Sequence, residues 1–173
     1  IVFVPFPNDP PQQVPEAGGA ARPLPIPEPF DERRFYPSFL PDGRHYLYLS
    51  IDLNTRNGRA IRIASIDSVE TKELASSTTS AVYAEPGYVI FRREKALVAQ
   101  PFNTRTLELQ GTPSVVVEAV GFSPLNYQGF FSASTTGVLA YLESDPGWHL
   151  VWFDRFGRRG DSAAPTGQYN SVC

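Results

Sequence analysis

The chain has few of the residues on which covalent and metal-centred chemistry depends. Its 173 residues include one cysteine, Cys173, and two histidines, His45 and His149. A single cysteine excludes a disulfide within the chain and a cysteine-based metal cage. Two histidines without a neighbouring cysteine make a poor zinc site, because zinc needs at least three protein ligands. We therefore expect no metal and no cofactor, and whether Cys173 pairs between chains stays open.

Excess charge of one sign and long apolar runs are also lacking. The 15 Lys and Arg residues stand against 18 Asp and Glu residues, for a net charge of -3, so we expect no nucleic acid as partner. No window approaches the roughly 20 apolar residues that cross a bilayer, and no basic start marks a signal peptide. We expect no membrane insertion by this segment. Because methionine is absent, we interpret the chain as a processed product or a piece of a longer protein.

The chain does contain an internal repeat. Hydrophobic residues make up 42% of the sequence, which is enough for a domain with a core. A glycine precedes an apolar, aromatic-rich run three times, at Gly43, Gly87 and Gly137, with separations of 44 and 50 residues. The run Ile1–Val4 continues the series one period earlier. We expect these glycines to form tight turns, with Gly43 at positive φ.

Each period carries further strand signals. An alternating segment that ends in Asp or Asn follows each run, and the three end residues are Asp67, Asn103 and Asp154. Asp and Asn suit such ends because their side chains bond nearby backbone amides in turns. One more short strand precedes each glycine, and no window shows a helical period. The sequence therefore predicts an all-β fold of four-stranded antiparallel units, the pattern of β-propeller blades.

The blades are expected to form a single β-propeller domain, or a segment of one, over residues 1–173. The approximate blades are 1–29 with 168–172, 30–79, 80–120 and 121–167. A blade hides its two apolar faces only by stacking against its neighbours. The chain holds about four blades, and two alternatives stay open: a ring closed by the C-terminal strand, or a segment of a larger ring.

Three stretches resemble TolB-type (WD40-like) propeller repeats: Tyr36–Tyr48, Phe131–Tyr141 and Leu150–Gly157. They are most similar to the propellers that follow the kinase domain and a membrane segment in bacterial serine/threonine protein kinases. That resemblance implies a sensor or protein-interaction scaffold in an extracytoplasmic location, periplasmic or extracellular. Kinase activity is not implied, since the kinase sequence motifs are absent from this chain.

Four residues are predicted to bind a partner: Trp148, His149, Arg92 and Arg93. Trp148 follows a turn, where an exposed aromatic ring can contact a partner, and His149 is interpreted as a surface or hydrogen-bonded strand residue. Of the aromatic residues that follow, Trp152 or Phe153, whichever faces inward, is expected in the core. The alternative explanation of the arginine pairs, including Arg33–Arg34, is a solvated strand edge.

Catalytic groups are not evident in the sequence. Asp42, Asp67 and Asp154 are the most regularly placed acids, yet each falls where a turn uses Asp for local hydrogen bonds, so structural roles are predicted. No Gly-x-Ser-x-Gly nucleophile elbow is present. We expect a non-enzymatic propeller that presents loops to a protein or small-molecule ligand. The alternative is the gate or cap of a serine hydrolase whose catalytic domain lies outside this chain, and self-association stays open.

Overall fold

The computed structural model describes residues 1–173 except 7–8, 28–31, 56–57, 135, 145–150 and 164–173. The described residues form strands, turns and loops without a helix, and all strand pairings are antiparallel, which confirms the all-β prediction. Within the described ranges there is consequently no helix of the length and hydropathy that a membrane span requires. The chain divides into two units, Ile1–Glu143 and Ser144–Cys173.

The first unit begins with a small sheet, sheet 1. It pairs β1 (Val2–Phe3), β2 (Gln12–Gln13) and β3 (Arg22–Pro23) in that order. Its strands are two residues long because prolines interrupt the hydrogen-bonding ladder. This irregular first sheet agrees with the expectation for residues 1–29. The strand that residues 168–172 were expected to add lies outside the described residues.

Sheet 2 follows as a four-stranded meander. Its strands are β4 (Glu32–Phe39), β5 (His45–Asp52), β6 (Arg59–Ser65) and β7 (Ser68–Ser76), paired in chain order. Four strands were expected within residues 30–79, and the four strands of this sheet lie there. The first strand begins earlier than the aromatic run starting at Tyr36 indicated, because Glu32 and Arg34 are buried as a pair and join the ladder.

Sheet 3 contains five strands, and its last two strands share the fourth position in the sheet. They are β8 (Ala81–Ala84), β9 (Tyr88–Arg93), β10 (Ala96–Asn103), β11 (Glu108–Leu109) and β12 (Ser114–Val117). The first three pair in order, and both β11 and β12 pair with β10 at different points along it. The fourth strand expected within residues 80–120 is thus divided between two short strands, because the chain turns back immediately after β10 and later returns along it.

The last expected four-stranded unit, residues 121–167, occurs as two separate hairpins. In the first unit, β13 (Phe131–Ala133) pairs with β14 (Leu139–Tyr141) to form sheet 4. In the second unit, β15 (Val151–Phe153) pairs with β16 (Arg159–Ser162). The strand positions agree with the sequence pattern. A local turn determines each hairpin, whereas pairing across a long connection depends on contacts that the pattern does not encode.

The turns follow their sequence signals closely. Gly43, Gly87 and Gly137 have φ of 63°, 147° and 86°, as a left-handed turn position requires. The Asp42 carboxylate accepts hydrogen bonds from the backbone amides of Arg44 and His45, with both N–O distances at 2.9 Å. Asn103 and Asp154 make the equivalent bonds to amides that follow them. Local hydrogen bonding therefore accounts for these acidic and amide side chains, as the sequence predicted.

Replacing Gly43 by valine is expected to lower the free energy of unfolding by about 1–2 kcal/mol, the cost of a left-handed conformation for an L residue. A Cβ at this position meets nothing within 4 Å, so the effect is conformational rather than steric. Urea unfolding followed by far-ultraviolet circular dichroism measures it. Gly43→Asn serves as control and should cost less, because asparagine tolerates this conformation; equal stability of Gly43→Val and the native chain would contradict the assignment.

Sheets 2 and 3 pack face to face through an apolar cluster. The middle of this face on β5 and β6 is aliphatic, as the cross-strand pair Leu47 and Ile63 illustrates. The cluster consists of Leu40, Leu47, Ile61, Ile63, Ala81, Val89, Phe91, Val98 and Phe102. Full burial of one large apolar side chain contributes about 1.5–3 kcal/mol. This interface is therefore the main core of the first unit.

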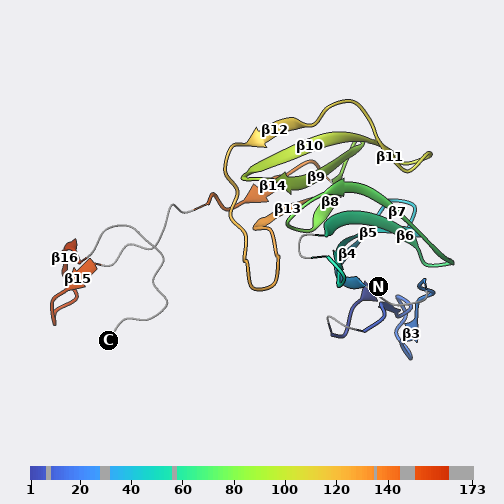
Figure 1. Ribbon diagram of the computed structural model, residues 1–173. Helices are drawn as coiled ribbons and strands as arrows, with labels where there is room; N and C mark the ends of the chain where they lie inside the picture. The colour runs from blue at the N-terminus through green and yellow to red at the C-terminus, as the bar shows by residue number, and fades with distance from the viewer. Residues whose placement is uncertain (7–8, 28–31, 56–57, 135, 145–150, 164–173) are drawn as a thin grey trace. The chain divides into compact units, whose positions relative to one another are not determined.

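Two smaller clusters join the remaining sheets of the first unit. Between sheets 1 and 2 lie Leu24, Tyr46, Tyr48 and Ala64, with Val2 and Ile66 packed against them. Between sheets 3 and 4 lie Ala84, Ile90, Leu97 and Val120, with side chains of β13 and β14 packed against them. Consecutive sheets therefore pack in chain order, which Figure 1 shows as the passage from blue through green to orange. The edge strands β1, β4, β8 and β13 contact one another in the same order.

Candidate functional site

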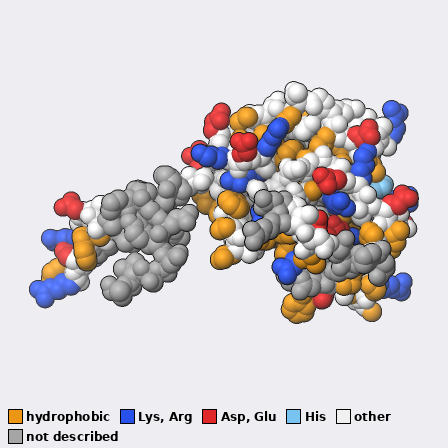
Figure 2. Space-filling model, in the orientation of Figure 1, with side chains coloured by type: hydrophobic (Ala, Val, Ile, Leu, Met, Phe, Trp, Pro, Cys, Tyr) orange, Lys and Arg blue, Asp and Glu red, His pale blue; other side chains and the backbone are white. Residues whose placement is uncertain are grey.

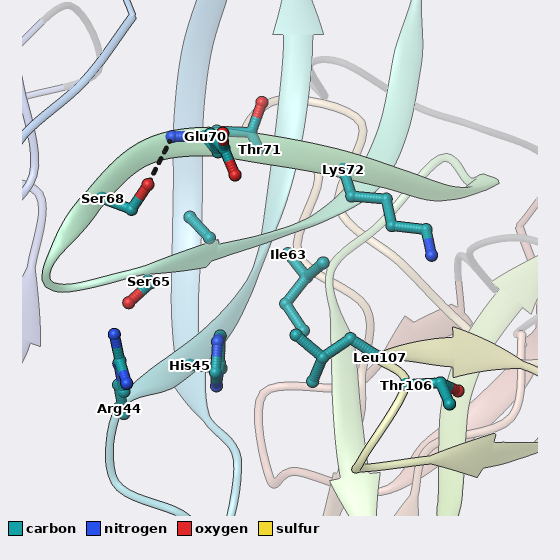
Figure 3. Close-up of a pocket in the computed structure, with 11 residues that line it drawn as sticks. Arg44, His45, Ile63, Ser65, Ser68, Glu70, Thr71, Lys72, Thr106 and Leu107 are labelled. Carbon is teal, nitrogen blue, oxygen red and sulfur yellow. Dashed lines mark hydrogen bonds between the residues drawn. The ribbon is translucent and has the colours of Figure 1, made fainter.

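A cleft of about 440 Å³ opens between sheet 2 and the turn that joins β10 to β11 of sheet 3. Figure 3 shows His45 and Arg44 at the start of β5, Lys72 on β7, and Thr106 and Leu107 on the opposing turn. This size lies within the range of small-molecule binding pockets. The cleft combines residues from two sheets, so it exists only because the sheets stack.

The lining of the cleft is part apolar and part polar. Ile63 belongs to the cluster between sheets 2 and 3, and Leu107 packs against that cluster, so an apolar surface extends into the cleft. Leu107 adopts φ of 55°, a left-handed conformation that ends the β10–β11 turn. Hydroxyl groups of Ser65, Ser68 and Thr106 add polar surface. An apolar surface with a few polar groups is the usual composition of a ligand pocket.

His45 is held by the turn that precedes it. Its Nδ1 lies 2.6 Å from Asp42 Oδ2, which leaves Nε2 as the ring nitrogen without this contact. Partial burial alone would raise the pKa of Asp42, but the hydrogen bonds from the His45 ring and from two backbone amides outweigh it and lower the pKa. Ser65 is paired with His45 in the β5–β6 register. The Ser65 hydroxyl, however, accepts a hydrogen bond from the backbone amide of Asp67. The arrangement therefore suits ligand contact better than activation of a serine nucleophile.

The two basic residues of the cleft are paired with carboxylates beside it. Arg44 Nε lies 2.9 Å from Asp67 Oδ2, and Lys72 Nζ lies 2.8 Å from Glu108 Oε1. The hydrogen bond and the charge of Lys72 lower the pKa of Glu108. These side chains are about half exposed, and exposed ion pairs contribute little to stability. The pairs therefore matter more for the local charge balance than for stability.

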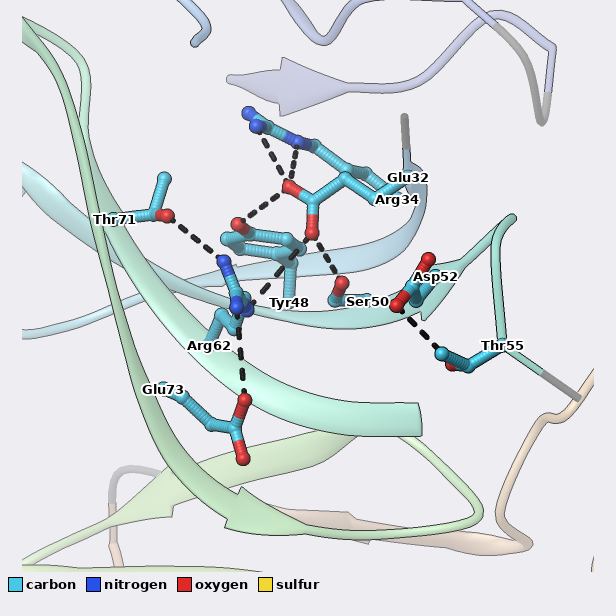
Figure 4. A network of polar contacts seen from close by, with 9 residues as sticks. All are labelled: Glu32, Arg34, Tyr48, Ser50, Asp52, Thr55, Arg62, Thr71 and Glu73. Carbon is cyan, nitrogen blue, oxygen red and sulfur yellow. Dashed lines mark hydrogen bonds and ion pairs between the residues drawn. The ribbon is translucent and has the colours of Figure 1, made fainter. Parts of the chain in front are cut away.

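A second polar constellation is buried on the opposite face of sheet 2 (Figure 4). Glu32 Oε1 accepts Arg34 Nε at 2.7 Å and the Tyr48 hydroxyl at 3.0 Å, and Oε2 accepts the Ser50 hydroxyl. Arg34 also lies over the Tyr48 ring, 5.0 Å from its centroid. Arg62 extends the network outward, with Nε 3.9 Å from Glu32 Oε2. The Glu32 carboxylate thus accepts bonds from three side chains around it.

This buried network is structural. Burial raises the pKa of Tyr48 well above its usual range, so the phenol stays neutral and donates to Glu32. A buried charge is tolerated when it is paired and hydrogen-bonded. The sequence did not reveal the network, because Arg33–Arg34 was interpreted as a solvated pair. Arg33 is exposed, whereas only 2% of the surface of Arg34 is accessible, so the interpretation is wrong for Arg34.

Arg92, a predicted binding residue, is buried. Its Nε donates to Val120 O at 3.2 Å, its Nη1 donates to Thr78 Oγ1 at 2.8 Å, and its guanidinium lies 4.2 Å from the centre of the Phe122 ring. Only 8% of its surface is accessible. The solvated-edge explanation is therefore wrong for Arg92, and the residue is not free to contact a partner. Arg93 is exposed at the end of β9.

The predicted aromatic contacts fall in the second unit. Trp148 and His149 lie outside the described residues, so their role stays a prediction. Trp152 or Phe153 was expected to lie in the core. Trp152 on β15 is 68% exposed within the described residues, so it is not that core residue. The side chain of Phe153 is outside the described part of the chain.

The cleft was not anticipated as a site. The sequence did place His45 on an apolar strand and Asp42 in its turn, but each was interpreted locally. The alternation on β5 and β6 could have put His45 and Ser65 on the face that carries the core. The contribution of Thr106 and Leu107 could not be foreseen, because it requires knowing which sheet packs there. Among the described residues, no cluster of three or more His, Cys, Asp or Glu side chains could hold a metal ion.

Neither the family models, nor the curated proteins, nor the solved structures contain a match to this chain.

Proposed function

We propose that this chain is part of a β-propeller and serves as a non-enzymatic binding module. The observation that supports the proposal is the packing of sheets 1 to 4 face to face in chain order, with edge strands β1, β4, β8 and β13 in successive contact. Sheets arranged in this way around an axis form propeller blades. The proposal includes the TolB-type relationship, a count of about four blades and an extracytoplasmic location, as the resemblance implies.

The cleft between sheets 2 and 3 is the proposed binding site. Loops carried by a rigid β scaffold are common positions for ligand contacts, and this cleft is bordered by the turns around His45, Ser68 and Thr106. Acidic and basic side chains are interspersed on the face of the first unit in Figure 2. Such a surface offers no strip of one sign for a polyanion. A protein loop or small ligand is therefore the expected partner, as the sequence predicted.

A cleft-filling substitution tests this function. Thr106→Trp places a large ring at the lining of the cleft, while Thr104→Trp places the same ring on an exposed part of the same turn outside the lining. In saturation-transfer nuclear magnetic resonance with a library of small soluble fragments, we expect the native chain and Thr104→Trp to bind a shared set of fragments. We expect Thr106→Trp to lose most of them. Equal binding by all three proteins would contradict the proposed site.

A further inference from the structure

The charge balance around the cleft indicates what kind of ligand it accepts. Two basic residues line it, Arg44 and Lys72, and each already has a carboxylate partner, Asp67 and Glu108. An incoming anion would have to compete with these carboxylates. The pairing therefore removes the apparent preference of the two basic residues for an anionic ligand.

Glu70 is the charged residue of the lining that has no such partner. Within the described ranges no ion pair or side-chain hydrogen bond engages its carboxylate. The backbone amide of Glu70 donates to the Ser68 hydroxyl at 3.1 Å, as the dashed line in Figure 3 shows. Asp42, which holds His45, adds a further negative charge at the edge of the cleft.

The cleft and its immediate partners therefore carry an excess of negative charge. The positive members are Arg44 and Lys72, and the negative members are Glu70, Asp42, Asp67 and Glu108. The balance is two positive against four negative with His45 neutral, and it stays negative when His45 is protonated. The electrostatic field of a cleft with this excess of negative charge favours the binding of a cation.

The apolar part of the lining determines the rest of the ligand. Ile63 and Leu107 present aliphatic surface inside the cleft. A small hydrated metal ion would not use this surface, whereas an aliphatic chain would lose water on contact with it. We infer that the cleft binds a small polyamine, a molecule with ammonium groups on an aliphatic stem. This inference rests on the proposed function and names its ligand class.

Three five-carbon probes with different end groups test the inference. Cadaverine carries two ammonium groups, glutarate two carboxylates and pentanediol two hydroxyls. We expect cadaverine, at low salt of about 20 mM, to shift the amide resonances of Ser68–Lys72 and Thr106–Leu107 of the 15N-labelled chain in a saturable way. Glutarate should leave these resonances in place, and pentanediol should shift them more weakly than cadaverine.

Charge-neutral variants identify the carboxylate responsible. Glu70→Gln should weaken cadaverine binding by about three-fold, the range of one exposed ion pair, and the spectrum itself reports whether the variant is folded. Glu118→Gln removes an exposed carboxylate outside the cleft lining and should leave the affinity unchanged. Raising the salt to about 0.5 M should weaken binding to the native chain.

The outcomes separate the ligand class from the site. If pentanediol or glutarate shifts the cleft resonances as strongly as cadaverine, the cationic preference is wrong and the cleft remains a binding site. If cadaverine shifts resonances widely over the first unit, if Glu70→Gln binds like the native chain, or if no probe affects the cleft, the inference is overturned. In the last case the fragment test with Thr106→Trp still decides the proposed function separately.

Discussion

Leu47→Ala is expected to lower the free energy of unfolding by about 3 kcal/mol, within the range for large-to-small substitutions in a core. Leu47 is fully buried in the cluster between sheets 2 and 3, so truncation removes apolar contacts and leaves a cavity. Because folded domains are stable by only about 5–15 kcal/mol, this loss is a large fraction of the total. Urea unfolding followed by far-ultraviolet circular dichroism measures it.

The choice of probe matters for this experiment. Both tryptophans, Trp148 and Trp152, lie in the unit Ser144–Cys173, so tryptophan fluorescence would report that unit rather than the sheets around Leu47. Leu53→Ala is the matched control, because Leu53 is 52% exposed and its truncation should change stability by less than about 0.5 kcal/mol. Similar losses in the two variants would mean that sheets 2 and 3 do not pack through Leu47.

Glu32→Ala is expected to destabilise the first unit by about 3–5 kcal/mol, the usual result of removing one partner of a buried ion pair. The substitution takes the carboxylate away from Arg34, Tyr48 and Ser50, which all donate to it. Their polar groups then lose hydrogen bonds in a place with little access to water. The same urea experiment, with circular dichroism as the probe, measures the effect.

Two variants show whether the pairing is responsible. Glu73 is an exposed carboxylate whose contact is with Arg62 at 3.6 Å, and Glu73→Ala should cost less than about 1 kcal/mol. The double variant Glu32→Leu with Arg34→Met should recover most of the stability lost in Glu32→Ala, since apolar pairs of similar size often replace buried ion pairs without loss. A mild effect of Glu32→Ala, equal to that of Glu73→Ala, would refute the structural role of the network.

The turns and strands were predictable because their causes are local. The left-handed conformation of Gly43 follows from a glycine after Pro41–Asp42, and the Asp42 hydrogen bonds follow from the reach of a carboxylate to amides two and three residues ahead. The alternation on β5 and β6 indicates strands with two distinct faces. Each of these signals lies within about ten residues of sequence. The sequence of a short segment is therefore enough to predict its turn or strand.

The charged residues were less predictable. Arg33 and Arg34 are adjacent in the chain, but successive strand residues point to opposite faces, so one is exposed and the other is buried beside Glu32. Arg92 is buried because the segment around Val120 and Phe122 returns over it, and Arg92 Nε donates to Val120 O, 28 residues further along the chain. The sequence pattern treats Arg33, Arg34 and Arg92 alike, although their surroundings in the fold differ completely.

What could be derived from the residues alone was the all-β class, the position of most strands, the tight turns and the local hydrogen bonds that close them. The burial of Arg34 and Arg92 and the cleft near His45 depended on how the folded sheets meet. The physical reason is range: a turn is stabilised by atoms a few residues apart, whereas the sheet interfaces and the cleft depend on many weak contacts between segments far apart in the chain.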